Sequence, residues 1–277
     1  MIDLRDLPST QLSEVAFRAD HLDVERVVRC YRDVGFVVVR GLLSVYMERM
    51  RAEIASAVAT ARDELATATL MPYGWMTRNG GIFKERSSAG DGDPGVRDMI
   101  VAPLSATSSA TMDACFRDAR LRQILDRLLD RDVNMTGAGQ CMYKEALHGN
   151  PAWFHQDDSY PQPVGPGGAE FRDVVTVFAY VVPTPIERGC IWVVPFSHRL
   201  GLVPHDKTGR YQGCIPEGVC DWSHAIAIPG APGDTVLWSG AAIHGSQANV
   251  TPEPRPAVVM RYARLAPPGQ ASVAGGP

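Results

Sequence analysis

The sequence predicts an α+β domain, mainly β, in which a β-sandwich or barrel is backed by helices that come first in the chain. Helical patterns occupy roughly the first half of the chain, and short apolar runs separated by glycine and proline clusters follow them. A length of 277 residues suits one large domain with a well-buried core. Helices first and strands afterwards therefore set the expected architecture.

Three stretches predict helices. Residues 23–33 carry apolar side chains at helical spacing, and Gly35 is placed to end that helix. Ser44 is the expected N-cap of a second helix that continues to about residue 66. A third helix is expected over residues 110–129, which end in LRQILDRLLD.

The remaining segments predict strands, one long loop and a tail. Residues 71–98 are rich in glycine, charge and aromatics without a sustained period, which predicts a loop of the kind that often serves as a lid. We expect one domain over residues 1–264 and a disordered tail over 265–277, because the tail lacks apolar content. Strands are expected in the runs FVVVR, VNMTGAGQCMYKEA, DVVTVFAYVV, CIWVVP, HAIAIP, DTVLWSG and AVVMRYARL.

Charge and composition argue against several partners. Lys and Arg number 27 against 31 for Asp and Glu, so the chain lacks the basic excess that a nucleic-acid surface would need. No apolar run approaches the ~20 residues of a membrane span, and the N-terminal segment alternates charges where a signal peptide would be apolar. We therefore expect a cytoplasmic chain whose six cysteines, without CxxC spacing, are reduced. The oligomeric state is left open.

The segment PAWFHQDDSYPQP contains the first candidate site. Residues i and i+2 of a strand share a face, so His155 and Asp157 would lie side by side while Asp158 points the other way. That geometry suits two ligands of one metal ion. A polar loop or a hydrogen-bonded core histidine would leave the same tripeptide, so this motif alone does not decide.

A distal histidine and an arginine supply what the first motif lacks. His244 follows the strand-like run TVLW, and Arg255 stands eleven residues later, on what we expect to be the neighbouring strand. Two histidines and one carboxylate form the facial triad that suits ferrous iron and leaves positions open for an α-keto acid and dioxygen. An arginine would then pair with the far carboxylate of the keto acid.

Together these motifs resemble the phytanoyl-CoA dioxygenase family of iron(II)- and 2-oxoglutarate-dependent oxygenases. The likeness runs from about residue 24 to 263 and includes, in the family's order, YRDVGFVVVRGLLS, HQD, ERGCIWVVPFSHRLG, APGDTVLW and HGSQANVTPEPR. The resemblance implies a double-stranded β-helix (jelly-roll) core backed by the N-terminal helices. Two departures concern substrate shape: VFAYVV lacks the family's frequent tryptophan, and Phe196 stands where glycine is usual.

The resemblance also implies roles for single residues. Arg255 would bind 2-oxoglutarate, with Ser246 and Gln140 as second contacts. Tyr160 and Trp153, which flank the ligands, are weaker candidates for substrate contacts. Three residues would bind Fe(II), namely His155, Asp157 and His244.

The remaining five histidines are interpreted as residues outside the metal site, and two of them, His205 and His224, have no carboxylate partner at strand spacing. His198 is expected to be a hydrogen-bonded turn residue, and His205 and His224 lie in a polar insertion as surface or lid residues. His148 and His21 are expected outside the ligand set.

The implied activity is hydroxylation, or a related oxidation, of a C–H bond in a small-molecule metabolite, with O2 consumed and succinate and CO2 released. The resemblance to this family of 2-oxoglutarate-dependent oxygenases also implies a role in secondary metabolism. Two alternatives stay open: a non-redox metal hydrolase or isomerase on the same barrel, and a metal-binding barrel without catalysis. The first leaves Arg255 without a chemical role, and the intact triad argues against the second.

Overall fold

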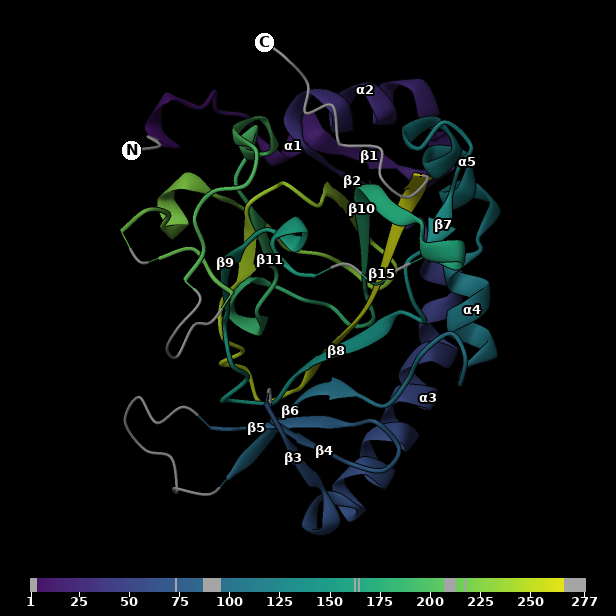
Figure 1. Cartoon of the computed structure of the whole chain (residues 1–277), viewed down its shortest axis with the longest axis vertical. Coiled ribbons are helices and arrows are strands. Elements are labelled where there is room, and N and C mark those ends of the chain that lie inside the picture. The colour runs from purple at the N-terminus through teal and green to yellow at the C-terminus, as the bar shows by residue number, and fades with distance from the viewer. Residues whose placement is uncertain are drawn as a thin grey trace.

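Two β-sheets face each other in the computed structural model, and helices cover the outer side of the larger sheet (Figure 1). The structure describes residues 4–72, 74–86, 96–161, 163, 165–206, 213–216 and 218–266. The α-helices are α1 (Leu12–Val15), α2 (Val24–Val34), α3 (Ser44–Asp63), α4 (Ala110–Phe116) and α5 (Ala119–Leu128).

The strands divide into a major and a minor sheet. The major sheet has the order β1 (Ala16–Arg18), β2 (Phe36–Arg40), β13 (Thr235–Ser239), β10 (Glu170–Tyr180), β15 (Arg255–Ala266), β8 (Gln140–Lys144), β6 (Arg97–Ala102), β5 (Ile82–Glu85), β4 (Gly74–Met76) and β3 (Thr69–Met71), with β7 (Asn134–Met135) beside β15. The minor sheet has the order β12 (Ile226–Ile228), β11 (Ile191–Val193), β14 (His244–Ser246) and β9 (Ala152–His155).

Side-chain alternation along the major sheet separates two cores. On β10, Val175 and Val177 pack against the helices, whereas Phe178 and Tyr180 pack into a cluster shared with the minor sheet. The shared cluster also contains Ile191 of β11, so the two sheets bury their inner faces against each other. This arrangement confirms the predicted mainly-β jelly roll backed by N-terminal helices.

Helix α2 shows why the predicted ends hold. Asp23 caps its start by accepting a hydrogen bond from Arg26 N at 3.1 Å. Gly35 ends it with φ of 90°, and its N–H donates to Tyr31 O at 2.8 Å. A Cβ on Gly35 would lie 2.3 Å from Nδ1 of His198, so both the backbone angle and the close approach require glycine.

Two helix predictions were wrong in detail. Asp118 interrupts the expected helix over residues 110–129, because its carboxylate caps α5 by accepting hydrogen bonds from Arg120 N and Leu121 N. Ser44 is the first residue of α3, and its hydroxyl donates to Pro232 O at 2.9 Å instead of capping the helix. That helix ends at residue 63.

The predicted loop over residues 71–98 is wrong where the structure describes it. The strands β3, β4, β5 and β6 form an antiparallel extension of the major sheet, seen at the lower end of Figure 1. Arg97 stacks over the Trp75 ring at 4.0 Å, and Arg86 pairs with Asp98 at 2.8 Å. Such cross-strand contacts leave no local period to detect. Residues 73 and 87–95 of the predicted loop lie outside the described residues.

The last strand continues past the predicted domain end. Leu265 and Ala266 pair with Phe171 and Glu170 of β10, so β15 extends two residues into the segment predicted as tail. Residues 267–277 lie outside the described residues. All six cysteines are free thiols, as predicted. Within the described ranges no helix has the length and apolarity needed to cross a membrane.

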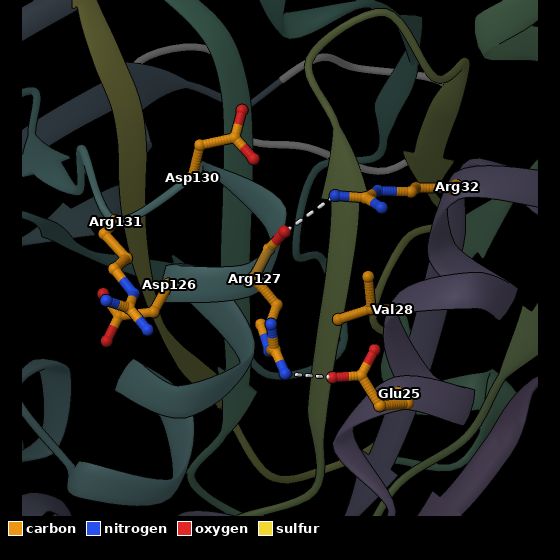
Figure 2. Close-up of a pocket in the computed structure, with 7 residues that line it drawn as sticks. All are labelled: Glu25, Val28, Arg32, Asp126, Arg127, Asp130 and Arg131. Atoms are coloured by element: carbon orange, nitrogen blue, oxygen red, sulfur yellow. Dashed lines mark hydrogen bonds and ion pairs between the residues drawn. The ribbon is translucent and has the colours of Figure 1, made fainter.

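A charged hollow of about 340 Å³ is lined by residues of α2, of α5 and of the turn that follows α5 (Figure 2). Arg127 pairs with Glu25 at 2.6 Å, and Arg32 donates to Arg127 O at 2.8 Å. These mutual contacts join the two helices, which accounts for much of the charge in the hollow without a ligand.

Tyr180 of the major sheet forms hydrogen bonds with the minor sheet, and its substitution tests how much these bonds stabilise the fold. Its buried hydroxyl donates to Ile228 O and accepts from Ile191 N at 3.0 Å. Tyr180→Phe leaves both backbone groups unsatisfied, so we expect a loss of about 1–3 kcal/mol in the free energy of unfolding, measured by chemical denaturation. Tyr46→Phe, at a partly exposed hydroxyl, is the control and should cost less; equal losses would contradict the argument.

Candidate metal centre

Three side chains of metal-ligand type converge between the two sheets. His155 is the last residue of β9, His244 is the first residue of β14, and the two are paired across these neighbouring strands. Their ring centroids lie 4.3 Å apart. One ligand atom from each histidine and one carboxylate oxygen of Asp157 all lie within 4.8 Å of one another. The fold thus brings together residues 89 positions apart in the sequence.

Asp157 reaches the cluster from a turn and not, as predicted, from a strand. β9 ends at His155, and Asp157–Ser159 forms a 3-10 turn. The intervening Gln156 points away: its amide nitrogen donates to Gly201 O at 2.7 Å and Ala241 O at 2.6 Å, and its amide oxygen accepts from Val203 N at 2.8 Å. These three bonds fix where the turn leaves the strand.

Backbone carbonyls orient both imidazoles. Nδ1 of His155 lies 2.7 Å from Trp153 O, and Nδ1 of His244 lies 3.0 Å from Ala242 O. Each Nδ1 therefore donates its proton, which leaves the Nε2 lone pair available to a metal. Burial, reinforced by the nearby His155, lowers the pKa of His244 to about 4 even though Asp157 opposes the shift. His244 is consequently neutral at pH 7 and stays neutral well below that pH. The neutral imidazole is the form that binds metals.

One cross-strand row of the major sheet holds the Asp157 carboxylate. Thr176 of β10 is paired with Trp238 of β13 on one side and with Arg261 of β15 on the other. Thr176 Oγ1 donates to Oδ2 at 2.6 Å, and Trp238 Nε1 donates to the same oxygen at 3.0 Å. Arg261 donates to Oδ1 at 2.8 Å. Both carboxylate oxygens are thus oriented before any metal arrives.

This environment keeps Asp157 ionised. Burial alone would raise the pKa of Asp157, but the neighbouring His244, Arg261 and His155 and the Thr176 hydrogen bond outweigh it, and the pKa is lowered. A carboxylate in this state is a hard oxygen donor, and with two neutral imidazoles it forms a set suited to a divalent transition metal.

Arg255 lies in the other sheet from His244, so the prediction of neighbouring strands was wrong. It begins β15, is 2% exposed, and is paired with Lys144 of β8. A run of ring contacts links it to the ligands: its guanidinium lies 5.6 Å from the Phe178 ring, and the Trp238 ring lies 6.0 Å from Phe178 and 4.6 Å from His244.

Arg255 has no ion-pair partner among the residues that the structure describes. Within the same residues its Nε has no hydrogen-bond partner, and burial lowers the pKa of Arg255 to about 10. Burial, with the charge of Arg255 adding to it, also lowers the pKa of Lys144 well below its usual value. An unpaired buried cation is costly, so this end of the barrel is built for a negatively charged ligand.

The family follows from the comparison with known proteins. A family model for phytanoyl-CoA dioxygenase (PhyH) matches residues 31–257. The chain belongs to the phytanoyl-CoA dioxygenase family. That membership confirms the resemblance drawn from the sequence motifs.

Relatives share parts of the sequence, and solved structures share the fold. Methylphosphonate hydroxylase of Gimesia maris is 32% identical over 132 residues, 44% of this chain and 49% of that protein. Ectoine dioxygenase of Sphingopyxis alaskensis is 27% identical over 168 residues, 56% of this chain and 54% of that protein. The chain thus spans about half the length of these relatives. EvdO2 from Micromonospora carbonacea var. aurantiaca, solved with 2-oxoglutarate, has a TM-score of 0.57 at 21% identity over 91% of this chain and 95% of that chain.

The other predicted PhyH-family site residues occupy different parts of the barrel. Ser246 is buried two residues after His244 on β14, hence on the same face. Gln140 is exposed and paired with Val259, four residues along β8 from Lys144. The Tyr160 ring lies 5.8 Å from that of His155. Trp153 packs towards Trp222, with ring centroids 6.4 Å apart.

The sequence analysis gives no role to Thr176, Trp238 or Arg261. Alternation would have found Arg261, which lies six residues, an even number, after Arg255 and so on the same strand face. No local pattern links Asp157 to Thr176 or Trp238. His205, predicted to be a surface or lid residue, accepts a hydrogen bond from Gln156 N at 3.1 Å and so supports the ligand turn.

Asp158 does not share the Asp157 environment. Its N–H donates to Gly240 O at 3.0 Å, and its carboxyl packs so closely on Gly240 that a Cβ there would lie 2.1 Å from Oδ1. Burial, with the charge of Asp157 second, raises the pKa of Asp158 to about 6. Adjacent aspartates thus differ: one is ionised and held by donors, and the other is half-buried without them.

Asp158 should therefore make stability fall as pH rises. An unfolded aspartate has a pKa of about 3.9, so between about pH 4 and 6 the folded state holds the extra proton and loses stability with increasing pH. In metal-free protein at pH 7.5, Asp158→Asn should raise the free energy of unfolding by about 1–2 kcal/mol, with no gain at pH 4. Denaturation curves at both pH values check this; a gain independent of pH would refute the assignment.

Proposed function

We propose that this protein is an Fe(II)- and 2-oxoglutarate-dependent dioxygenase that hydroxylates a C–H bond of a small-molecule metabolite. In the proposed reaction one atom of O2 enters the product as its hydroxyl oxygen, and the other enters succinate as 2-oxoglutarate loses CO2. Iron(II), when bound, supplies the site at which O2 is reduced. The chain's residues supply binding, orientation and exclusion of water.

The observation that carries the proposal is the buried, unpaired guanidinium of Arg255. A facial set of two histidines and a carboxylate also serves metals that catalyse hydrolysis or isomerisation, so the triad does not distinguish these classes. A second anion site deep in the same barrel does, because 2-oxoglutarate carries a free carboxylate away from the end that chelates metal. A two-pronged arginine is suited to that carboxylate.

Each proposed ligand has a defined task. His155 and His244 would bind the metal through Nε2, since Nδ1 of each is engaged by a carbonyl. Asp157 would contribute an oxygen while Thr176 and Trp238 keep its carboxylate from rotating. Arg255, and Ser246 as a second contact, would bind the far carboxylate of 2-oxoglutarate. The apolar cluster between the sheets keeps this end of the barrel dry.

The named relatives support hydroxylation as the reaction class. One is a methylphosphonate hydroxylase and another an ectoine dioxygenase, each acting on a small molecule by its name. The two rival functions, a non-redox metalloenzyme and a barrel that only binds metal, leave Arg255 unexplained.

A direct test is the visible charge-transfer band that forms when 2-oxoglutarate chelates protein-bound Fe(II) in the absence of O2. We expect this band with one iron per chain, and succinate release once O2 is admitted. Iron binding without the band or succinate would favour a rival function.

The ligand assignment predicts how iron binding responds to substitution. His155→Ala, His244→Ala and Asp157→Ala should each lower iron affinity at least a hundredfold, since one of three protein ligands is lost. Asp158→Ala, at the neighbouring acid that makes no contact of this kind, should bind iron as the native protein does. Equilibrium dialysis with metal analysis checks this; native-like iron occupancy in the histidine variants would disprove the assignment.

Substitution of Arg255 should impair binding of the co-substrate and leave iron binding intact. Arg255→Ala should retain iron and weaken 2-oxoglutarate binding by roughly two to four powers of ten, because one partner of a buried charged pair is removed. Arg255→Lys should recover only part of the loss, since an ammonium is a single-point donor. Anaerobic titration of the charge-transfer band measures both. Arg264→Ala, at an exposed arginine of the same strand, is the control; unchanged affinity in Arg255→Ala would assign the carboxylate to another cation.

A further inference from the structure

We propose that Arg261 recognises an anionic group of the primary substrate, so that the site selects small molecules bearing a carboxylate, phosphonate or phosphate. The proposal rests on the proposed function and names its substrate class. Arg261 would then have two tasks, holding Asp157 and binding the substrate anion.

Arg261 has unused hydrogen-bonding capacity. Its side chain is 33% exposed, and its single hydrogen bond within the described part of the chain runs from one terminal nitrogen to Asp157 Oδ1. By comparison, Arg86 donates twice to Asp98. A guanidinium offers five N–H donors in a rigid fork, so the remaining donors of Arg261 are available to a second, incoming anion.

Its position separates it from the 2-oxoglutarate end. Arg255 and Arg261 lie on the same face of β15, about 20 Å apart along the strand. Arg255 is paired with Lys144, whereas Arg261 is paired with Thr176 beside the metal ligands. The charge of Arg261 acts on Tyr160, whose ring lies beside that of His155. Arg261 thus lies beside the proposed metal ligands with a third of its side chain exposed.

The one ion pair that Arg261 makes in the described structure involves a proposed metal ligand. Its partner is Asp157, and the metal would claim that same carboxylate.

Other ionisable groups near Arg261 do not occupy its remaining donors. Asp158 is near enough for its charge and that of Arg261 to interact, but no ion pair joins the two side chains in the described structure. Asp173 is paired with Arg264 instead. His155 and His244 are neutral when they bind metal, and Lys144 lies at the Arg255 end. A substrate anion could therefore pair directly with Arg261.

The test uses methylphosphonate, the substrate in one relative's name, and its uncharged dimethyl ester as a matched neutral probe. Binding of each to the anaerobic Fe(II) and 2-oxoglutarate complex is measured by calorimetry. We expect the native protein to bind methylphosphonate at least tenfold more tightly than the ester. Arg261→Gln should weaken methylphosphonate binding about ten- to a hundredfold and leave the ester unaffected. Arg264→Gln should leave both unaffected.

The same samples distinguish the two sources of an anion. If Arg261→Gln weakens 2-oxoglutarate binding as much as methylphosphonate binding, Arg261 serves the co-substrate and the proposal is overturned. It is also overturned if the native protein shows no preference for the anion, or if the preference survives in Arg261→Gln. A native protein without the charge-transfer band would instead refute the proposed function.

Because Arg261 also contacts Asp157, iron content is measured in each variant. If Arg261→Gln loses iron, Arg261→Lys decides, since it retains a charged donor but not the fork. Tenfold weaker methylphosphonate binding with unchanged ester binding is then expected. Unchanged methylphosphonate binding in Arg261→Lys would overturn the proposal.

Discussion

The buried carboxylate of Asp157 is the constraint on which the rest of the site depends. It leaves the minor sheet at the end of β9, yet the side chains of Thr176, Trp238 and Arg261 that donate to it come from three adjacent strands of the major sheet. Burying an unpaired carboxylate costs several kcal/mol, so these bonds favour the arrangement of the two sheets that brings the donors to it. The same hydrogen bonds therefore join the two sheets and orient the carboxylate of the metal centre.

The two histidines are also held in a fixed orientation before a metal binds. Each imidazole is oriented by the carbonyl two residues before it, which belongs to β9 for His155 and to the turn before β14 for His244, so backbone alone fixes both rings. Side chains oriented in this way lose little conformational entropy when a metal binds. The cost lies in charge: Arg255 remains buried without a partner, and binding of an anion relieves that cost. Under the proposed function, affinity for the co-substrate would come partly from pairing of this buried cation.

What the sequence could predict depended on the range of each interaction. Strand alternation and the order His155, Asp157, His244 and Arg255 are local or motif-level features, and they led to the family. Even there the reason was partly wrong, because a turn held by Gln156, and not a continued strand, aims Asp157. The donors to Asp157 lie up to 104 residues away, beyond any periodic pattern. Phe196 adopts φ of 61° where glycine is usual, a strain sustained by burial of its ring.

Strand β15 carries both arginines of the proposed reaction, one for the co-substrate and one for the substrate. The two positions differ in how readily another residue could replace the arginine. In the proposed reaction Arg255 is enclosed and would face a co-substrate of fixed structure, so its environment has little reason to vary. Arg261 would face substrates that differ, but it also holds the proposed metal ligand Asp157. Replacing it to accept a neutral substrate would remove its hydrogen bond to Oδ1, whereas the bonds from Thr176 and Trp238 are both made to the other oxygen. Under this proposal, selection by substrate charge is coupled to metal geometry, because one guanidinium serves both the carboxylate and the substrate anion.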